Sequence, residues 1–261
     1  MIEMHDLTFS INEKVILENL TLQVAPKMLT CIMGPNGAGK STALRILAGL
    51  ENPSYGECSY QNNPLQEISR ACKSNLFSFM DSEMHVSVPI RVEEFLTLAK
   101  IVKDNSTEAT FYLDDFTNQV WEKLDLSLWS NRFLHQLSSG EKQRCFFALA
   151  MLQKTFFTFL DEPVSHMDPR YASLCLDLVK HLCRKGLGAV VVLHDINQIL
   201  QYADQVFALK HGKIFFAGKP GDVLNSKNLN SLYDTDNYSI FSLEDGGAVV
   251  YQSRRRGVLE D

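Results

Sequence analysis

One glycine-rich segment limits what this chain can fold into more than any other feature. The apolar run from Leu29 to Met33 is typical of a buried strand, and it ends at the segment Gly34 to Ser41. After this segment, Leu44, Leu47 and Ala48 have helical spacing. The order strand, glycine loop and helix predicts an α/β arrangement at the start of the chain.

The glycine segment also has the composition of a phosphate cradle. A glycine is followed by four residues of any kind and then by Gly-Lys-Ser, so the backbone can curl and direct successive N–H groups at one centre. The following helix adds its positive N-terminus. A glycine turn that arose by chance is the alternative, and the flanking strand and helix disfavour it. The predicted nucleotide-binding residues are Gly34, Pro35, Asn36, Gly37, Ala38, Gly39, Lys40, Ser41 and Thr42.

Three of these side chains have predicted roles. We expect Lys40 to reach the β- and γ-phosphates and Thr42 to contact the α-phosphate side. Ser41 is expected to bind Mg²⁺ through its hydroxyl. The pattern therefore predicts a bound nucleotide with Mg²⁺.

Two carboxylates form a second candidate site. Asp161 and Glu162 directly follow an apolar strand predicted from Phe156 to Leu160. Ligands of open α/β sheets collect at the carboxyl ends of strands, so we expect Asp161 to hold Mg²⁺ through water and Glu162 to polarise an attacking water. Adjacent acids are more often a solvated surface pair, but the apolar strand before this pair favours a site.

A histidine follows another predicted strand. His194 comes directly after the run from Ala189 to Leu193, again at a carboxyl end. A lone histidine is more often a satisfied core or surface group. Together with the two other sites, its placement predicts a hydrogen-bond donor to the γ-phosphate that also positions the water and Glu162. The predicted catalytic residues are Glu162, His194 and Lys40.

The remaining patterns predict one domain over residues 1–261. Short alternating segments before Val24 indicate antiparallel strands, and the alternation of strands and helices after Leu137 implies a parallel sheet with helical crossovers. Residues 84–137 have helical patterns joined by a polar stretch from Lys103 to Thr110, which indicates an inserted helical subdomain. We expect a RecA-like core and β subdomain over about 1–83 and 138–235. A tail follows over about 236–261, with a solvated run from Arg254 to Arg256.

Composition excludes some classes of protein. With 45% apolar residues in 261, the chain can bury one core without disulfides or metals. The net charge of −6 disfavours a surface built to bind nucleic acid or an anionic bilayer. No apolar run approaches the roughly 20 residues that cross a bilayer, and we expect no signal peptide. The six cysteines stand singly, so we expect reduced thiols that pack in the core.

A further motif resembles a known family. Leu137 to Glu141 precedes the Asp161-Glu162 pair by a short spacing, and this resembles the signature motif of ABC ATPases. The similarity runs from about Leu7 to Tyr233 and includes Ser165 to Asp168, which resembles the loop that links two subunits' active sites. The fold class that this implies is α/β: a P-loop NTPase of ABC type with a mixed sheet core, an antiparallel β subdomain and an inserted α-helical subdomain.

The resemblance also implies a head-to-tail dimer. Each ATP would lie between the glycine loop of one subunit and the signature segment of the other. Ser138 and Gly140 would offer a hydroxyl and a backbone N–H to the γ-phosphate, and Ser139, Glu141 and Asp168 complete the implied nucleotide-binding set. Ser138 would also cap the following helix, which is compatible with this role.

A narrower similarity concerns the ATPases of iron-siderophore, haem and cobalamin importers. It rests on His194 to Gln198, Tyr202 to Asp204, and the Gly-Lys pairs at 212–213 and 218–219. It implies an ATP-hydrolysing transporter subunit, peripheral at the cytoplasmic face of the inner or cell membrane. Implied partners are a second copy or a homologous ATPase, transmembrane permease subunits and a substrate-binding protein, with no nucleic acid. The alternatives are a soluble ABC ATPase that assists iron-sulfur cofactor assembly, and a binding-only subunit with weak turnover.

The chain departs from the family pattern at four places. Family members usually have a glutamine after the strand predicted from Leu76 to Met80, where Asp81 or Ser82 stands here. An aspartate can still reach a metal-bound water, so Asp81 is the third predicted metal-site residue after Ser41 and Asp161. Ile11 stands where an adenine-stacking aromatic is expected, with Phe9 two residues earlier. Ser139 replaces a glycine and Glu141 replaces a glutamine in the signature segment.

Overall fold

A six-stranded sheet organises the computed structural model, which describes residues 1–84, 86, 88–101, 114–242 and 248–253. Its strand order is β10-β9-β3-β8-β7-β6. Adjacent strands are parallel except at the edge, where β10 is antiparallel to β9. The strands are β3 (Leu29–Met33), β6 (Phe77–Met80), β7 (Phe157–Asp161), β8 (Gly188–Val192), β9 (Gln205–Lys210) and β10 (Lys213–Gly218).

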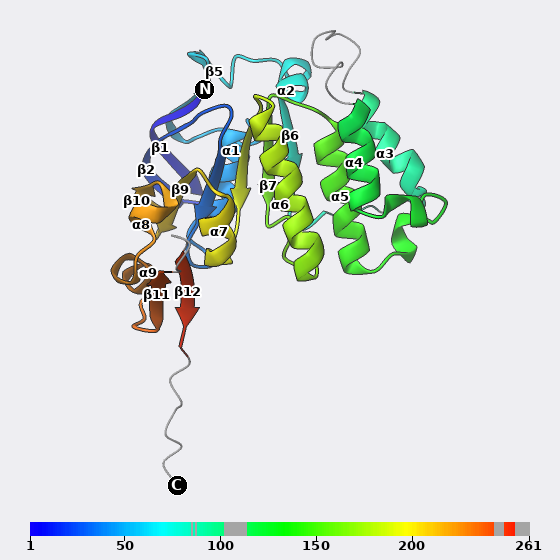
Figure 1. Cartoon of the computed structure of the whole chain (residues 1–261). Coiled ribbons are helices and arrows are strands. Elements are labelled where there is room, and N and C mark those ends of the chain that lie inside the picture. The colour runs from blue at the N-terminus through cyan, green and yellow to red at the C-terminus, as the bar shows by residue number, and fades with distance from the viewer. Residues whose placement is uncertain (85, 87, 102–113, 243–247, 254–261) are drawn as a thin grey trace.

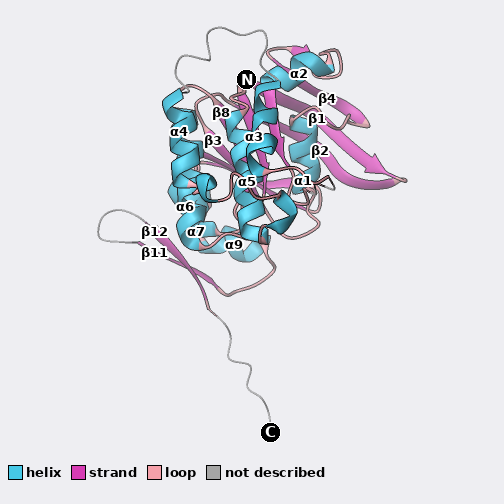
Figure 2. Ribbon diagram, turned by 90° about the vertical axis from the view of Figure 1, so that its right-hand side faces the viewer, coloured by secondary structure: helices cyan, strands magenta, loops and turns pink. Residues whose placement is uncertain are grey.

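One face of this sheet is covered by α1 (Lys40–Leu47) and a second sheet. The second sheet is antiparallel, in the order β2-β1-β4-β5, and consists of β1 (Ile2–Ile11), β2 (Lys14–Val24), β4 (Tyr55–Tyr60) and β5 (Asn63–Pro64). Apolar residues of α1 pack between the two sheets in one buried cluster. Figure 2 shows these antiparallel strands on the side of the molecule opposite the helices α4, α6 and α7.

Helices cover the other face of the central sheet. They are α5 (Ser139–Leu152), α6 (Pro169–Arg184) and α7 (Ile196–Tyr202), with α3 (Val92–Ile101) and α4 (Asp114–Lys123) beyond them (Figure 1). Phe95 of α3 packs edge-to-face on Phe146 of α5, with ring centroids 5.5 Å apart. The short 3-10 helices η1 (Leu126–Leu128) and η2 (Leu134–Gln136) lead into α5. The predicted polar stretch Lys103 to Thr110 lies outside the described residues.

Side chains of the parallel strands alternate between the two buried clusters. In β8, Val191 belongs to the cluster under the helices, whereas Val190 and Val192 belong to the cluster under α1. Such strands are buried on both faces, which explains their nearly continuous apolar sequence. The arrangement confirms the predicted fold class and directs the carboxyl ends of β3, β7 and β8 to one edge.

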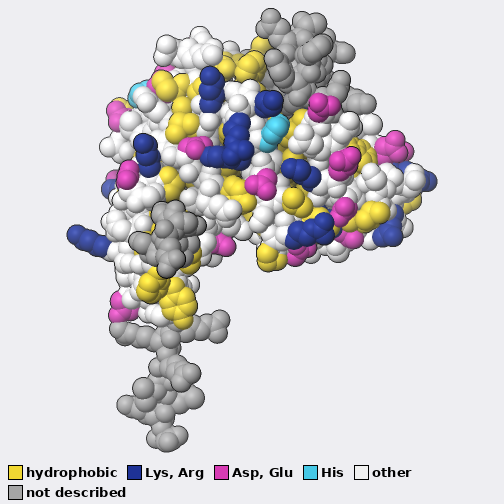
Figure 3. Space-filling view, in the orientation of Figure 1, with side chains coloured by type: hydrophobic (Ala, Val, Ile, Leu, Met, Phe, Trp, Pro, Cys, Tyr) yellow, Lys and Arg dark blue, Asp and Glu magenta, His cyan; other side chains and the backbone are white. Residues whose placement is uncertain are grey.

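The periphery contains elements that the sequence patterns did not predict. These are β4, β5, α2 (Arg70–Leu76), α8 (Pro220–Val223), α9 (Ser226–Leu232) and a hairpin of β11 (Tyr238–Ser242) with β12 (Ala248–Gln252). The hairpin exposes Phe241, Val249 and Tyr251, and hydrophobic side chains are visible there in Figure 3. The predicted run Arg254 to Arg256 lies outside the described residues.

Two predictions from composition can be compared with the structure. All six cysteines are free thiols; Cys72 is exposed and the other five are buried. Among the residues that the structure describes, no helix has both the length and the apolar character needed to span a bilayer.

Candidate nucleotide site

The glycine loop between β3 and α1 has a backbone that few other residues could adopt. Gly34, Gly37 and Gly39 have φ of +139°, +76° and +94°. A Cβ at Gly34 would lie 2.1 Å from the carbonyl oxygen of Leu209. Because neither the positive φ nor this approach tolerates a side chain, the glycine pattern determines the shape of the loop.

Lys40 at the start of α1 points back into the loop. Its Nζ donates to the carbonyl oxygens of Gly34 at 3.0 Å and Pro35 at 2.9 Å, and the residue is only 6% exposed. Burial lowers the pKa of Lys40, while the nearby charges of Glu162 and Asp161 act in the opposite direction. The ammonium group is therefore held inside the cradle, where phosphate oxygens would replace weaker carbonyl acceptors.

Asp161 ends β7 and is fully buried. Its Oδ1 has no hydrogen-bond partner, and its Oδ2 lies 3.5 Å from the hydroxyl of Ser82. Burial raises the pKa of Asp161, a hydrogen bond with Ser41 opposes the rise, and the charge of Glu162 adds to it. A buried carboxylate oxygen without a partner is costly unless a cation satisfies it. The carboxylate and the Ser41 hydroxyl are oxygen ligands of the kind Mg²⁺ prefers, so the residues present fit this ion.

Glu162 and His194 meet across two parallel strands. Asp161 of β7 is in register with Val192 of β8, so the residues after each strand end are neighbours. His194 Nε2 lies 2.7 Å from Glu162 Oε1, and both side chains are about one-third exposed or more (42% and 32%). Glu162 has φ of +48°, a conformation that costs about 1–3 kcal/mol for a residue other than glycine. A carboxylate on a strained backbone and oriented by a histidine is arranged as a general base would be.

Asp81, after β6, is engaged by other groups. Its Oδ2 accepts from Arg45 of α1 at 2.8 Å, and its Oδ1 accepts from the N–H of Glu83 at 3.2 Å. The next residue, Ser82, is the one whose hydroxyl faces Asp161. Asp81 is still close enough for its charge to raise the pKa of Asp161. Both residues that stand at the expected glutamine position therefore border the predicted metal site.

The signature segment forms the N-terminus of α5. Glu141 Oε2 accepts from the N–H of Ser138 at 2.7 Å and from its hydroxyl at 2.9 Å, and Ser138 Oγ accepts from the N–H of Glu141 at 3.4 Å. These hydrogen bonds lower the pKa of Glu141. The pair is a capping box, which confirms the predicted cap at Ser138.

Asp168 caps α6 in a similar way and accepts from the N–H groups of Arg170 and Tyr171. It lies on the same surface hollow as the signature segment. The residues that line the hollow are Ser138, Gly140, Glu141, Arg144, His166, Met167, Asp168 and Tyr171. They come from α5 and its N-cap, from α6, or from the loop between β7 and α6. Ser139 lines a neighbouring hollow with Asp81 and Ser82.

The two candidate adenine-stacking residues differ in exposure. Phe9 is 9% exposed and packs in the cluster between the two sheets, whereas Ile11 at the end of β1 is 51% exposed. The strand pairing shifts register between Phe9 and Ser10. Of these two residues, only Ile11 is accessible to an adenine ring.

One functional candidate was missed at the sequence level. Gln143 of α5 is 6% exposed and donates a hydrogen bond to the carbonyl oxygen of Glu162. The sequence offered no separate signal for it, because Gln143 stands in a polar first turn between Lys142 and Arg144. Only the tertiary structure brings it to Glu162.

Comparison with known proteins identifies a family and several relatives of similar sequence. Residues 17–165 match the family described as ABC transporter. A hemin import ATP-binding protein of Escherichia coli is 32% identical over 90% of this chain and 93% of its own length. A petrobactin import ATP-binding protein of Bacillus subtilis is 27% identical over 90% and 93%.

Solved structures show the same fold. The ATP-binding subunit of an ABC transporter has a TM-score of 0.77 and 23% identity, covering 85% of this chain and 91% of that one. The dimeric structure of a bacterial ABC transporter cassette has a TM-score of 0.72 and 24% identity, covering 84% and 99%.

Proposed function

This chain belongs to the ABC transporter family of ATPases, and from that premise we propose that it drives the import of a metal chelate such as an iron-siderophore, haem or cobalamin. The observation that carries the proposal is the similarity, over 90% of the chain, to import ATP-binding proteins for hemin and petrobactin. The ATP-hydrolysing role is that of the family; the class of cargo is the proposal.

The residues of the site have distinct roles in the proposed hydrolysis. The backbone N–H groups of the glycine loop and Lys40 hold the triphosphate, and Ser41 and Asp161 hold Mg²⁺, with Asp81 and Ser82 beside them. When bound, Mg²⁺ offsets the negative charge of the phosphates. Glu162 accepts a proton from the attacking water, and His194 orients Glu162 and donates to the γ-phosphate. The 2.7 Å contact between Glu162 and His194 supports this assignment.

The signature residues are proposed to act on a second nucleotide. Ser138, Ser139, Gly140, Glu141 and Asp168 would contact the ATP held by the glycine loop of another copy, or of a homologous ATPase. The exposed hollow at the start of α5 supports this proposal, because its lining comes from outside the glycine loop. The dimeric form of a similar cassette supports it further.

The further partners are also proposed. We expect transmembrane permease subunits and a substrate-binding protein, with this chain peripheral at the cytoplasmic face of the membrane. The import proteins to which the chain is similar support this arrangement.

Reconstitution tests the proposal in two steps. First, the purified chain should hydrolyse MgATP. Second, membranes that contain a co-expressed permease from the neighbouring genes should retain the tagged chain, and proteoliposomes with a binding protein should take up haem, a ferric siderophore or cobalamin only with ATP. Hydrolysis without retention by any permease would contradict the import role and favour the soluble ATPase of cofactor assembly. Nucleotide binding without turnover would favour a binding-only subunit.

A further inference from the structure

A buried amide on the signature helix contacts the backbone of the catalytic glutamate. Gln143 projects from α5 one turn after Gly140, and its Nε2 donates to the carbonyl oxygen of Glu162 at 2.9 Å. The hydroxyl of Ser165 donates to the same oxygen at 3.1 Å. The carbonyl group of Glu162 is thus held by two donors, one of which comes from a different element.

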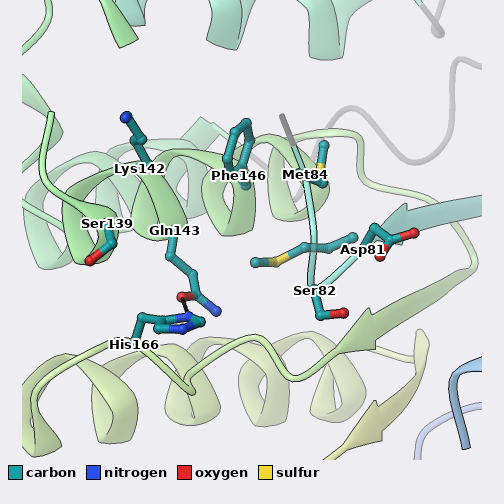
Figure 4. A pocket seen from close by; sticks show the side chains of 9 residues that line it. Asp81, Ser82, Met84, Ser139, Lys142, Gln143, Phe146 and His166 are labelled. Carbon is teal, nitrogen blue, oxygen red and sulfur yellow. Dashed lines mark hydrogen bonds between the residues drawn. The ribbon is translucent and has the colours of Figure 1, made fainter. Parts of the chain in front are cut away.

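His166 completes this network, and the donor role of Gln143 fixes which nitrogen of the ring carries the proton. His166 Nδ1 lies 3.0 Å from Gln143 Oε1 and 3.1 Å from Ser165 Oγ. Because the amide nitrogen of Gln143 donates to Glu162, its oxygen must accept, so Nδ1 of His166 carries the proton. Figure 4 shows the Gln143 side chain reaching down from α5 to the His166 ring.

The backbone of the same helix also lies against this loop. A Cβ on Gly140 would be 2.9 Å from the carbonyl oxygen of His166, closer than ordinary van der Waals contact. Gly140 and Gln143 are three residues apart and therefore share one face of α5. Two neighbouring contacts on one helix face hold the loop after Glu162 to the start of the signature helix.

The position held in this way is a strained one. Glu162 keeps φ of +48° without being glycine, so the surrounding contacts must stabilise it. Its carboxylate must also remain at the 2.7 Å contact with His194. Hydrogen bonds to the carbonyl group of the same residue limit rotation of the backbone that carries the carboxylate.

We propose that Gln143 is a positioning residue for Glu162, which ties the base of one nucleotide site to the signature helix that serves the nucleotide of the opposite subunit. This rests on the proposed function of the two sites. Gln143 touches neither nucleotide directly. It acts through the Glu162 carbonyl group, with His166 holding its amide in the donating orientation.

The variant that tests this is Gln143→Met, which keeps length and removes both hydrogen-bonding groups. We expect kcat for ATP hydrolysis to fall about 10-fold or more, because small displacements of a catalytic group are costly, while KM for ATP stays within two-fold. Gln153→Met, a matched change at the residue that caps the C-terminus of α5, should leave both constants unchanged.

Two further measurements separate positioning from a general loss of structure. Amide hydrogen exchange should become faster in residues 162–168 in Gln143→Met, with no change in β3 or β8. His166→Ala should lower kcat in the otherwise unchanged chain but add little in the Gln143→Met background, since the two residues act through one network.

The outcomes distinguish this inference from the proposed function. An unchanged kcat in Gln143→Met, or additive effects of the two substitutions, would overturn the positioning role while leaving the ATPase intact. A wild-type chain that binds ATP but does not hydrolyse it would contradict the proposed function itself, and exchange at residues 162–168 would still report on the hydrogen bonds.

Discussion

The two groups of predicted nucleotide-binding residues differ in how their polar atoms are satisfied. Around the glycine loop, Asp161 Oδ1 is buried without a partner, Glu162 has a positive φ, and Lys40 binds the loop's own carbonyl groups. At the start of α5, by contrast, Ser138 and Glu141 satisfy each other near solvent. In the first group, a bound ligand would satisfy polar atoms that the protein leaves unpaired or pairs only with the loop's own carbonyl groups. The second group is satisfied without a ligand, and in the proposed function it contacts a nucleotide only when another molecule presents it.

The largest effect expected within the first group is that of Glu162→Gln. Hydrolysis should fall by about 100-fold or more, because the amide cannot accept a proton from water, whereas MgATP binding should persist. An ATP-dependent dimer should accumulate in size-exclusion chromatography with light scattering. Turnover within a few-fold of the wild type would remove Glu162 from this role.

Within the same group, Lys40→Ala should affect ATP binding. The loss of a buried ammonium group that faces the phosphates should weaken ATP binding by about 10- to 100-fold, the effect of about 1.4–3 kcal/mol. Isothermal titration calorimetry at constant ionic strength measures this. An unchanged affinity would contradict the cradle assignment.

Asp161→Asn sharpens the contrast by separating stability from function. The raised pKa of Asp161 means that the folded state disfavours its charge, so the nucleotide-free variant should melt at a higher temperature than the wild type at neutral pH. Below the ordinary Asp pKa both states of the wild type are protonated, so the gain should disappear in acid. Calorimetric scans across pH check the sign. A variant less stable than the wild type at neutral pH would show that the charged carboxylate does not destabilise the folded state.

The smallest effect is expected in the second group, from Glu141→Gln. The amide oxygen can still accept from the N–H of Ser138, so α5 should keep its cap, but a negative charge beside the incoming γ-phosphate is lost. ATP-dependent dimerisation of the Glu162→Gln chain should strengthen by a few-fold, while ATP binding by the monomer stays unchanged. If the Glu162→Gln chain dimerises equally with and without Glu141→Gln, the Glu141 carboxylate does not lie near the shared nucleotide.

Short-range patterns predicted much of the fold and site. The glycine spacing, the apolar run before Asp161 and the run before His194 located three strand ends, because each depends on residues that are adjacent in the chain. The missed strands β4, β11 and β12 have mixed or exposed faces, so they lack the continuous apolar signal of β3 or β8. The sequence also could not show which of Phe9 and Ile11 is exposed. Strand alternation places both on one face, whereas a register shift in β1 separates their environments.

By itself, the sequence determined that a tight glycine loop joins a strand to a helix, and it predicted which groups would hold phosphate and metal: glycines that permit positive φ, a lysine after them, and acids at a strand end. Only the tertiary structure decided how these groups are used. It pairs Asp81 with Arg45 and directs Ser82 towards Asp161, and it brings Gln143 to the Glu162 carbonyl group. The physical reason is that backbone conformation follows local residue types, whereas hydrogen-bond partners depend on parallel strands and helices that are distant in the chain.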